Sequence, residues 1–271
     1  MKVFIAIDLE GISGVVAERD VDRDGSAAAA ARVNMAADLD AVVEGCLAAG
    51  AAAIVVCDAH DDGRNLDASG LPDGVTLVSG SPTPYSMLQG LGRGYDGALF
   101  VGYHARAGTA AAVLEHTWNY KIFSALFGDL EVGEFGFGAL LAGYFAVPAV
   151  YVSGDDKTAV EAEALVPGIT TTVVKTGVMR LSAELCPPDE ARQRIRDDVE
   201  RALTAVEKPA PLAWNGEPLR LIFTRAEFCD LAAACPGARR IAGRTLELRG
   251  AVFEEIYRAF LACVSLSDGG D

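Results

Sequence analysis

The sequence predicts an α/β fold of three α/β/α layers, with a mainly parallel, Rossmann-like sheet between helices and a small α+β appendage after it. Two observations support this prediction. Short apolar runs recur along the chain, and the first, residues 3–7 (VFIAI), is apolar at every position, as expected for a strand buried on both faces. These runs alternate with longer segments of helical periodicity, which is the pattern of βαβ units.

The predicted elements of the main sheet follow one another in regular alternation. We expect strands at residues 3–7, 53–57, 75–78, 97–101, 149–153 and 170–175. We expect helices at residues 27–49, 85–91, 135–144 and 157–165, and a hairpin of strands 122–127 and 130–132. Ser26 is the predicted N-cap of the first helix, and Gly50 is its predicted C′ residue.

The pattern changes at Pro187 and Pro188, and we place a domain boundary there. Residues 1–188 are predicted to form the α/β domain that carries the chemistry, and residues 189–271 an α+β subdomain packed on it. The second part should contain helices 189–207, 225–234 and 251–264 and strands 219–224 and 245–248. The tail, residues 265–271, is expected to be loose.

The composition excludes several classes of partner. A net charge of −15 disfavours nucleic acid, because phosphate binding needs a basic face. The longest apolar stretches contain Gly and Pro and fall short of the ~20 residues that a membrane helix needs. Asp8 interrupts the first apolar run, so no signal peptide is expected, and the predicted location is cytoplasmic. The six scattered cysteines are interpreted as reduced, buried thiols.

Two carboxylates follow the first predicted strand. Asp8 and Glu10 are two residues apart, so in extended backbone they point the same way at the carboxyl edge of the sheet, where open α/β folds bind ligands. Carboxylates held together repel each other unless a proton or a cation lies between them. This pair therefore indicates either a carboxyl dyad or a metal site.

The three histidines favour the metal site. His60 and His104 each follow a predicted strand, which brings them to the same edge as the two carboxylates, and the third is His116. A lone histidine is more often structural, but imidazole and carboxylate together suit Zn²⁺, with Mn²⁺ or Co²⁺ as substitutes.

Six short motifs, in this order, carry a resemblance to a known family. They are Ile7-Asp8-Leu9-Glu10-Gly11-Ile12-Ser13-Gly14, Asp58-Ala59-His60, Gly102-Tyr103-His104-Ala105-Arg106, His116-Thr117, Val132-Gly133-Glu134 and Ser153-Gly154-Asp155-Asp156. In order and spacing they resemble the zinc D-aminopeptidase family encoded in dipeptide-transport operons. The resemblance runs from residue 1 to about residue 188 and continues more weakly beyond it.

The resemblance implies a binuclear metalloprotease site with two zinc ions per chain. By position, the implied metal ligands are Asp8, Glu10, His60, His104 and Glu134, and the implied catalytic residue is His116. Three carboxylates set against two divalent cations leave one positive charge, which a bridging hydroxide would neutralise, and five ligands are too many for one tetrahedral zinc unless one bridges. We expect Asp8 to bridge. The family also implies a homo-oligomer, namely a decamer of stacked pentameric rings.

The expected reaction is metal-assisted hydrolysis of the amino-terminal peptide bond of short peptides containing D-amino acids, with His116 as general base or acid for the departing amine. An alternative is a two-metal hydrolase of another small amide or a phosphoester. A third is a ligand-binding module without catalysis. Asp58 could orient His60, contact substrate or act as a cap. Arg106 and Asn65 are possible substrate contacts, although loop hydrogen bonding is the simpler interpretation of both.

Overall fold

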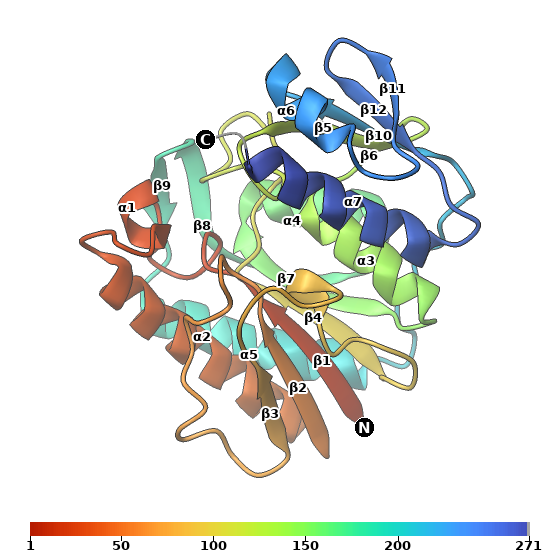
Figure 1. Cartoon of the computed structure of the whole chain (residues 1–271). Helices are drawn as coiled ribbons and strands as arrows, with labels where there is room; N and C mark the ends of the chain where they lie inside the picture. The colour runs from red at the N-terminus through yellow and green to blue at the C-terminus, as the bar shows by residue number, and fades with distance from the viewer. Residues whose placement is uncertain (270–271) are drawn as a thin grey trace.

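The computed structural model describes residues 1–269 and contains two sheets with helices around them (Figure 1). The larger sheet has the strand order β3 (Val75–Val78), β2 (Ala53–Asp58), β1 (Lys2–Ile7), β4 (Gly97–Val101), β7 (Ala149–Asp155), β8 (Thr170–Met179) and β9 (Ser182–Leu185). Its strands pair in parallel except β9, which is antiparallel to β8. This arrangement confirms the predicted α/β class.

The smaller sheet is antiparallel. Its order is β11 (Arg239–Ala242), β12 (Thr245–Leu248), β10 (Leu219–Phe223), β5 (Ile122–Phe127) and β6 (Leu130–Glu131). The helices are α1 (Glu18–Val21), α2 (Ala28–Ala48), α3 (Glu134–Tyr144), α4 (Asp156–Leu165), α5 (Pro188–Thr204), α6 (Ala226–Ala232) and α7 (Phe253–Asp268), with a 3₁₀ turn at Ser86–Leu88.

Strand β1 lies inside the larger sheet, between β2 and β4, and separates two layers of the core. Val3 and Ile5 belong to a cluster that includes the inner faces of α2 and α5. Phe4 and Ala6 belong to a second cluster, which includes α3, α7 and the smaller sheet. This alternation is the reason why β1 is apolar at every position from residue 3 to residue 7 and confirms that it is buried on both faces.

The predicted boundary at residue 188 falls between segments that interlock. Helix α5, from the second segment, packs against α2 of the first. Strand β10, also from the second segment, pairs with β5 of the first. The two helices lie together on one side of the larger sheet in Figure 1. The division into residues 1–188 and 189–271 stays a prediction.

Three local predictions are wrong: the helix at residues 85–91, the N-cap at Ser26 and the loose tail. The helix expected at residues 85–91 is only a 3₁₀ turn, because Ser86 has a φ of +49° and Gly90 a φ of +101°, both outside the right-handed helical region. Ser26 is not the N-cap of α2. The N-cap is Ala27, which makes no side-chain hydrogen bond to the helix, and the Ala28 N–H donates to the Gly25 carbonyl instead.

The tail is helical rather than loose as far as Asp268, because Ser267 is buried and α7 continues through it. Residues 270–271 of that expectation lie outside the described residues. Strands β9 and β11 and the short helix α1 were not predicted. No helix within residues 1–269 combines the length and the apolar character that spanning a membrane would need.

Candidate metal centre

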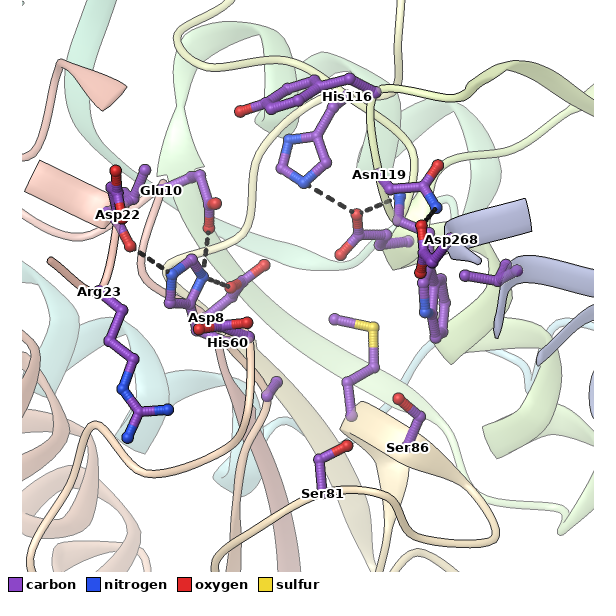
Figure 2. Close-up of a pocket in the computed structure, with 18 of the residues that line it drawn as sticks. Asp8, Glu10, Asp22, Arg23, His60, Ser81, Ser86, His116, Asn119 and Asp268 are labelled. Carbon is purple, nitrogen blue, oxygen red and sulfur yellow. Dashed lines mark hydrogen bonds and ion pairs between the residues drawn. The ribbon is translucent and has the colours of Figure 1, made fainter. Parts of the chain in front are cut away.

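The ends of three adjacent strands bring the predicted ligands together. Strand β1 leads to Asp8 and Glu10, and its neighbours β2 and β4 lead to His60 and His104. Glu134 is the first residue of α3. The residues Asp8, Glu10, His104 and Glu134 are at most 4% exposed. Figure 2 shows Asp8, Glu10 and His60 grouped on one side of a cavity, with His116 across from them.

Gly11 lets the backbone after β1 come close to the backbone after β4. Its N–H donates to the Gly102 carbonyl over 2.7 Å. A Cβ at position 11 would lie 2.0 Å from the Tyr103 carbonyl oxygen, so any larger residue would push the two segments apart. This contact fixes Glu10 relative to His104.

His60 faces two carboxylates with one ring nitrogen. Its Nε2 lies 2.9 Å from the Val21 carbonyl oxygen, which can only accept, so Nε2 carries the proton. Its Nδ1 lies 3.2 Å from Asp8 Oδ1 and 3.1 Å from Glu10 Oε2. The lone pair of Nδ1 is therefore available to a metal ion between the three side chains.

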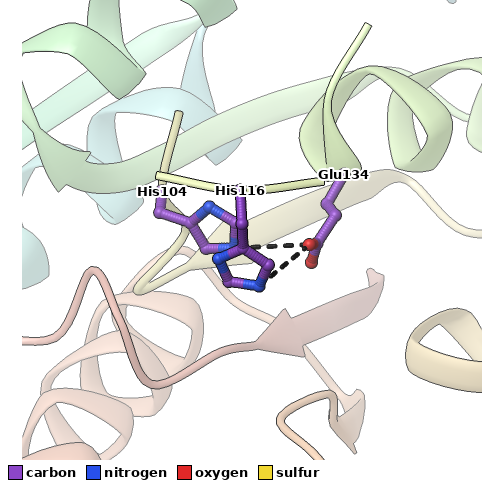
Figure 3. A group of neighbouring side chains, drawn as sticks. All are labelled: His104, His116 and Glu134. Atoms are coloured by element: carbon purple, nitrogen blue, oxygen red, sulfur yellow. Dashed lines mark ion pairs between the residues drawn. The ribbon is translucent and has the colours of Figure 1, made fainter. Parts of the chain in front are cut away.

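His104 and His116 are held in the same way, each by a backbone carbonyl, and both face Glu134 (Figure 3). Nδ1 of His104 is 3.0 Å from the Ala105 carbonyl oxygen, and Nδ1 of His116 is 2.9 Å from the Leu114 carbonyl oxygen. In its neutral form, each ring therefore carries its proton on Nδ1 and has its lone pair on Nε2. The His104 Nε2 faces Asp8 Oδ2 at 3.5 Å and Glu134 Oε1 at 3.4 Å, and the His116 Nε2 is 3.5 Å from Glu134 Oε1. The two rings stack with centroids 4.0 Å apart.

The pKa values reflect crowded negative charge. Burial and the neighbouring Glu10 raise the pKa of Asp8 to about 7. Burial alone would lower the pKa of His104, but the Glu134, Glu10 and Asp8 carboxylates together outweigh it and raise the value to about 10. His60 behaves in the same way beside Glu10, and its pKa lies well above the usual range. His116 differs, because burial and the adjacent His104 lower its pKa.

These observations fit a site for divalent cations. Three buried carboxylates favour positive charge between the donor atoms, which a metal ion supplies. Among the described residues, the buried Glu10 Oε2 and His104 Nε2 have no hydrogen-bond partner. Two groups of three donors each have ligand atoms within 4.8 Å of one another: Asp8, Glu10 and His104, and His104, His116 and Glu134. His116 thus lies within reach of a metal, although the sequence interpretation gave it only a catalytic role.

The centre opens into a cavity of about 620 Å³. Its wall includes the apolar side chains of Val21, Met87, Trp118 and Val264. It also contains four carboxylates outside the predicted ligand set, namely Glu18, Asp22, Asp61 and Asp268. This space is large enough for a small organic substrate beside the metal-binding side chains.

The structure gives the three secondary candidates other contacts. The Asp58 carboxylate accepts from the backbone N–H groups of Asn65 and Leu66, so it caps the loop after β2. The Asn65 side chain donates to Asp58 Oδ1 and to the His60 carbonyl oxygen. The Arg106 guanidinium lies 3.1 Å from Glu131. None of the three lines the cavity, so each has a loop-holding contact rather than a place beside the metal centre.

Two residues near the centre were missed by the sequence interpretation. The Lys175 ammonium is buried and donates to the carbonyl oxygens of Glu10, Ile12 and Val15 at 2.5, 3.0 and 2.6 Å. The backbone N–H of Trp118 donates to Glu134 Oε1 over 2.6 Å and so orients that carboxylate. A lysine inside the otherwise β-like run at residues 170–175 was the available signal for Lys175. Trp118 acts through its backbone, for which its residue type gives no signal.

Known proteins share this architecture over nearly the whole chain. The D-aminopeptidase of Bacillus subtilis (strain 168) is 32% identical over 269 residues, which cover 98% of each chain. The solved structure of the Zn-dependent D-aminopeptidase DppA from Bacillus subtilis, described as a self-compartmentalizing protease, matches with a TM-score of 0.95 and 31% identity over 99% of this chain and 98% of that one. The family model Peptidase_M55, D-aminopeptidase, matches residues 1–262. With this match and this identity, the chain belongs to the D-aminopeptidase family.

Proposed function

We propose that this protein is a zinc-dependent aminopeptidase that hydrolyses the amino-terminal bond of short peptides containing D-amino acids. The observation that carries the proposal is the set of three imidazoles, each donating one N–H to a backbone carbonyl and turning its other nitrogen towards buried carboxylates. Such carbonyl contacts fix the tautomers of metal-binding histidines. The family relationship supplies the substrate class.

We assign two zinc ions to each chain. Asp8, Glu10 and His60 would hold one, and His104 and Glu134 the other, with Asp8 between the two imidazoles. Asp8 supports this assignment because one of its oxygens faces His60 and the other faces His104. When bound, zinc supplies Lewis-acid polarisation of the scissile carbonyl and lowers the pKa of the attacking water.

His116 would handle the proton. Its Nδ1–H is held by the Leu114 carbonyl, so Nε2 has a free lone pair directed towards the cavity side of Glu134. A lowered pKa keeps this imidazole neutral and able to accept a proton from the attacking water. The same nitrogen can then donate that proton to the departing amine.

The proposal extends to assembly. The relative of known structure is described as self-compartmentalizing, and we expect this chain to form a homo-oligomer, with a decamer as the specific form. Light scattering combined with size exclusion would give the mass of the particle. The cytoplasmic location stays a prediction from the sequence.

Zinc stoichiometry measured together with substrate turnover tests the proposal. We expect about two zinc ions per chain, and we expect hydrolysis of D-alanyl anilide to be far faster than that of L-alanyl anilide or nitrophenyl phosphate. Rapid phosphate-ester hydrolysis would favour the other two-metal hydrolase. Protein that is fully stable without zinc after growth in metal-replete medium, and inactive on all three substrates, would contradict an enzymatic role.

A further inference from the structure

A second cavity adjoins the first and has no role in the function described so far. It has a volume of about 430 Å³ and shares Glu18, His116 and Tyr120 with the first cavity. Ile122 and Phe123 contribute an apolar wall. Because His116 lines both cavities, a substrate whose scissile bond lies at His116 can extend into each of them.

The two cavities differ in charge. The first is lined by seven carboxylates, and Arg23 is the only Lys or Arg among the described residues around it. The second has two carboxylates, Glu18 and Glu115, and its only described Lys or Arg is Arg180. A peptide carries an ammonium at one end and a carboxylate at the other. The acidic cavity suits the ammonium end. The second cavity suits the carboxylate end better, because its Arg180 shares the space with two carboxylates, whereas Arg23 of the first cavity shares it with seven.

A carboxylate already occupies this position within the chain. Glu18 Oε1 accepts from Arg180 Nη1 over 2.5 Å, and Glu18 Oε2 accepts from the Tyr120 hydroxyl over 2.8 Å. Arg180 and Tyr120 therefore present two donors to the two oxygens of one carboxylate. The Arg180 and Glu18 side chains are 34% and 44% exposed, and such pairs are weak enough for a competing carboxylate to exchange with Glu18.

Arg180 also lies at a suitable distance from the reaction centre. The His116 and Tyr120 ring centroids are 5.2 Å apart, and Arg180 Cζ is 5.1 Å from the Tyr120 centroid. The guanidinium is thus within roughly 10 Å of the imidazole, the length of about three extended residues. A peptide with one to three residues after the scissile bond can reach it.

We propose that Arg180 and Tyr120 form a subsite for the C-terminal α-carboxylate of short peptides, which Glu18 occupies in the free protein. The residue after the scissile bond lies against Ile122 and Phe123, and the amino-terminal residue lies in the acidic cavity. This inference rests on the proposed function and adds the reason for a preference for short peptides.

The test compares kcat/KM for D-alanyl-D-alanine with kcat/KM for its C-terminal amide, because their ratio is insensitive to general damage. The wild-type protein should prefer the free carboxylate. In Arg180→Gln the ratio should fall at least about tenfold, equivalent to about 1.4 kcal/mol. In Tyr120→Phe, which removes one hydroxyl from an exposed side chain and keeps the ring beside His116, it should fall by a smaller factor.

Two further variants sharpen the comparison. Glu18→Gln should raise the ratio, because the internal competitor loses its charge. Arg93→Gln, at an exposed arginine that lines neither cavity, should keep the wild-type ratio. An active Arg180→Gln and an active Tyr120→Phe that both retain the wild-type ratio would refute the subsite alone. A wild-type protein that hydrolyses neither compound would refute the proposed function, and the subsite with it.

Discussion

Residues 8–16 and the loop 105–121 both contribute to the metal centre, but their backbones are held differently. In the first segment, the N–H groups of Asp8 and Gly11 donate to the carbonyls of Val101 and Gly102 at the end of β4, and Lys175 donates to three of the segment's carbonyls. Its one residue with positive φ is a glycine, Gly14 at +83°. The segment therefore presents Asp8 and Glu10 from a backbone with many tertiary bonds.

The loop 105–121 contains three non-glycine residues in the left-handed region. Ala111, Leu114 and Trp118 have φ values of +59°, +53° and +66°. Each such residue costs of order 1 kcal/mol or more, and this cost is met by the surrounding structure. The Leu114 carbonyl fixes the His116 tautomer, and the Trp118 N–H orients Glu134, so the strained positions act directly on the site.

This difference between the two backbones matches the different roles that we propose for the two segments. The bonded segment 8–16 carries Asp8 and Glu10, which we assign as ligands of the cation. The strained loop carries His116, to which we assign the proton transfer. Changes in the first should abolish metal binding, and changes in the second should lower turnover while the metal stays bound.

The largest effect is expected from Asp8→Asn, which keeps the size of the side chain and removes its charge. Zinc content should fall towards zero and kcat/KM by about a thousandfold or more, because the metal supplies several kcal/mol of transition-state stabilisation. Elemental analysis and D-alanyl anilide hydrolysis measure the two quantities. Asp73→Asn, at an exposed aspartate before β3, is the matched control and should retain both. Full zinc content in Asp8→Asn would show that Asp8 is no ligand.

His116→Ala tests the other side of the comparison. We expect kcat to fall by about 10²- to 10⁴-fold, the usual contribution of a general acid or base, while about two zinc ions stay bound. His116 Nε2 lies in one donor group with His104 and Glu134, so the zinc measurement decides between the two roles. Loss of one zinc ion from His116→Ala would make His116 a ligand and would remove the distinction between the two segments.

Sequence reasoning reached the bonded half of the site more completely than the strained half. The short apolar runs and the helical segments between them were enough to place strands 75–78 and 97–101 with the observed bounds, and therefore the sheet edge with Asp8, Glu10, His60 and His104. Local pattern determines these elements because each buries an apolar face.

Three features that shape the site and the smaller sheet could not be predicted from local patterns: carbonyl contacts, left-handed backbone and long-range strand pairing. The carbonyls of Val21 and Leu114 hold His60 and His116, and any residue type can supply a carbonyl. Left-handed φ at Leu114 and Trp118 contradicts the preference of those residues and is imposed by tertiary structure. The pairing of β5 with β10 joins positions 92 or more residues apart in sequence, which no local period encodes.

Lys175→Met should destabilise the protein rather than act on the chemistry. Methionine has a similar length but no donor. The carbonyls of Glu10 and Val15 would therefore lose the lysine hydrogen bond, whereas the Ile12 carbonyl would keep its bond from the Val15 N–H. At about 1–3 kcal/mol for each of these two unsatisfied groups, the free energy of unfolding should fall by about 2 kcal/mol or more. Urea unfolding measures this change, with Lys157→Met as the control, since Lys157 is 31% exposed and its ion pair with Asp156 is worth at most about 1 kcal/mol. Equal, small losses in both variants would mean that Lys175 does not hold the segment.

Ala111→Gly should give the smallest effect and tests whether loop strain serves the site. Glycine adopts positive φ freely, which removes about 1 kcal/mol of strain, but it also gains freedom in the unfolded chain, so we expect a net gain in unfolding free energy of only about 0.5 kcal/mol. Ala146→Gly is the matched control, because Ala146 has a φ of +60° outside the site. Both variants should gain similar stability in urea unfolding, whereas kcat should fall severalfold only in Ala111→Gly, because a relaxed loop holds the His116 tautomer and position less firmly. If kcat is the same in both, the left-handed backbone at Ala111 is a consequence of packing, and the contrast between the two segments is one of hydrogen bonding alone.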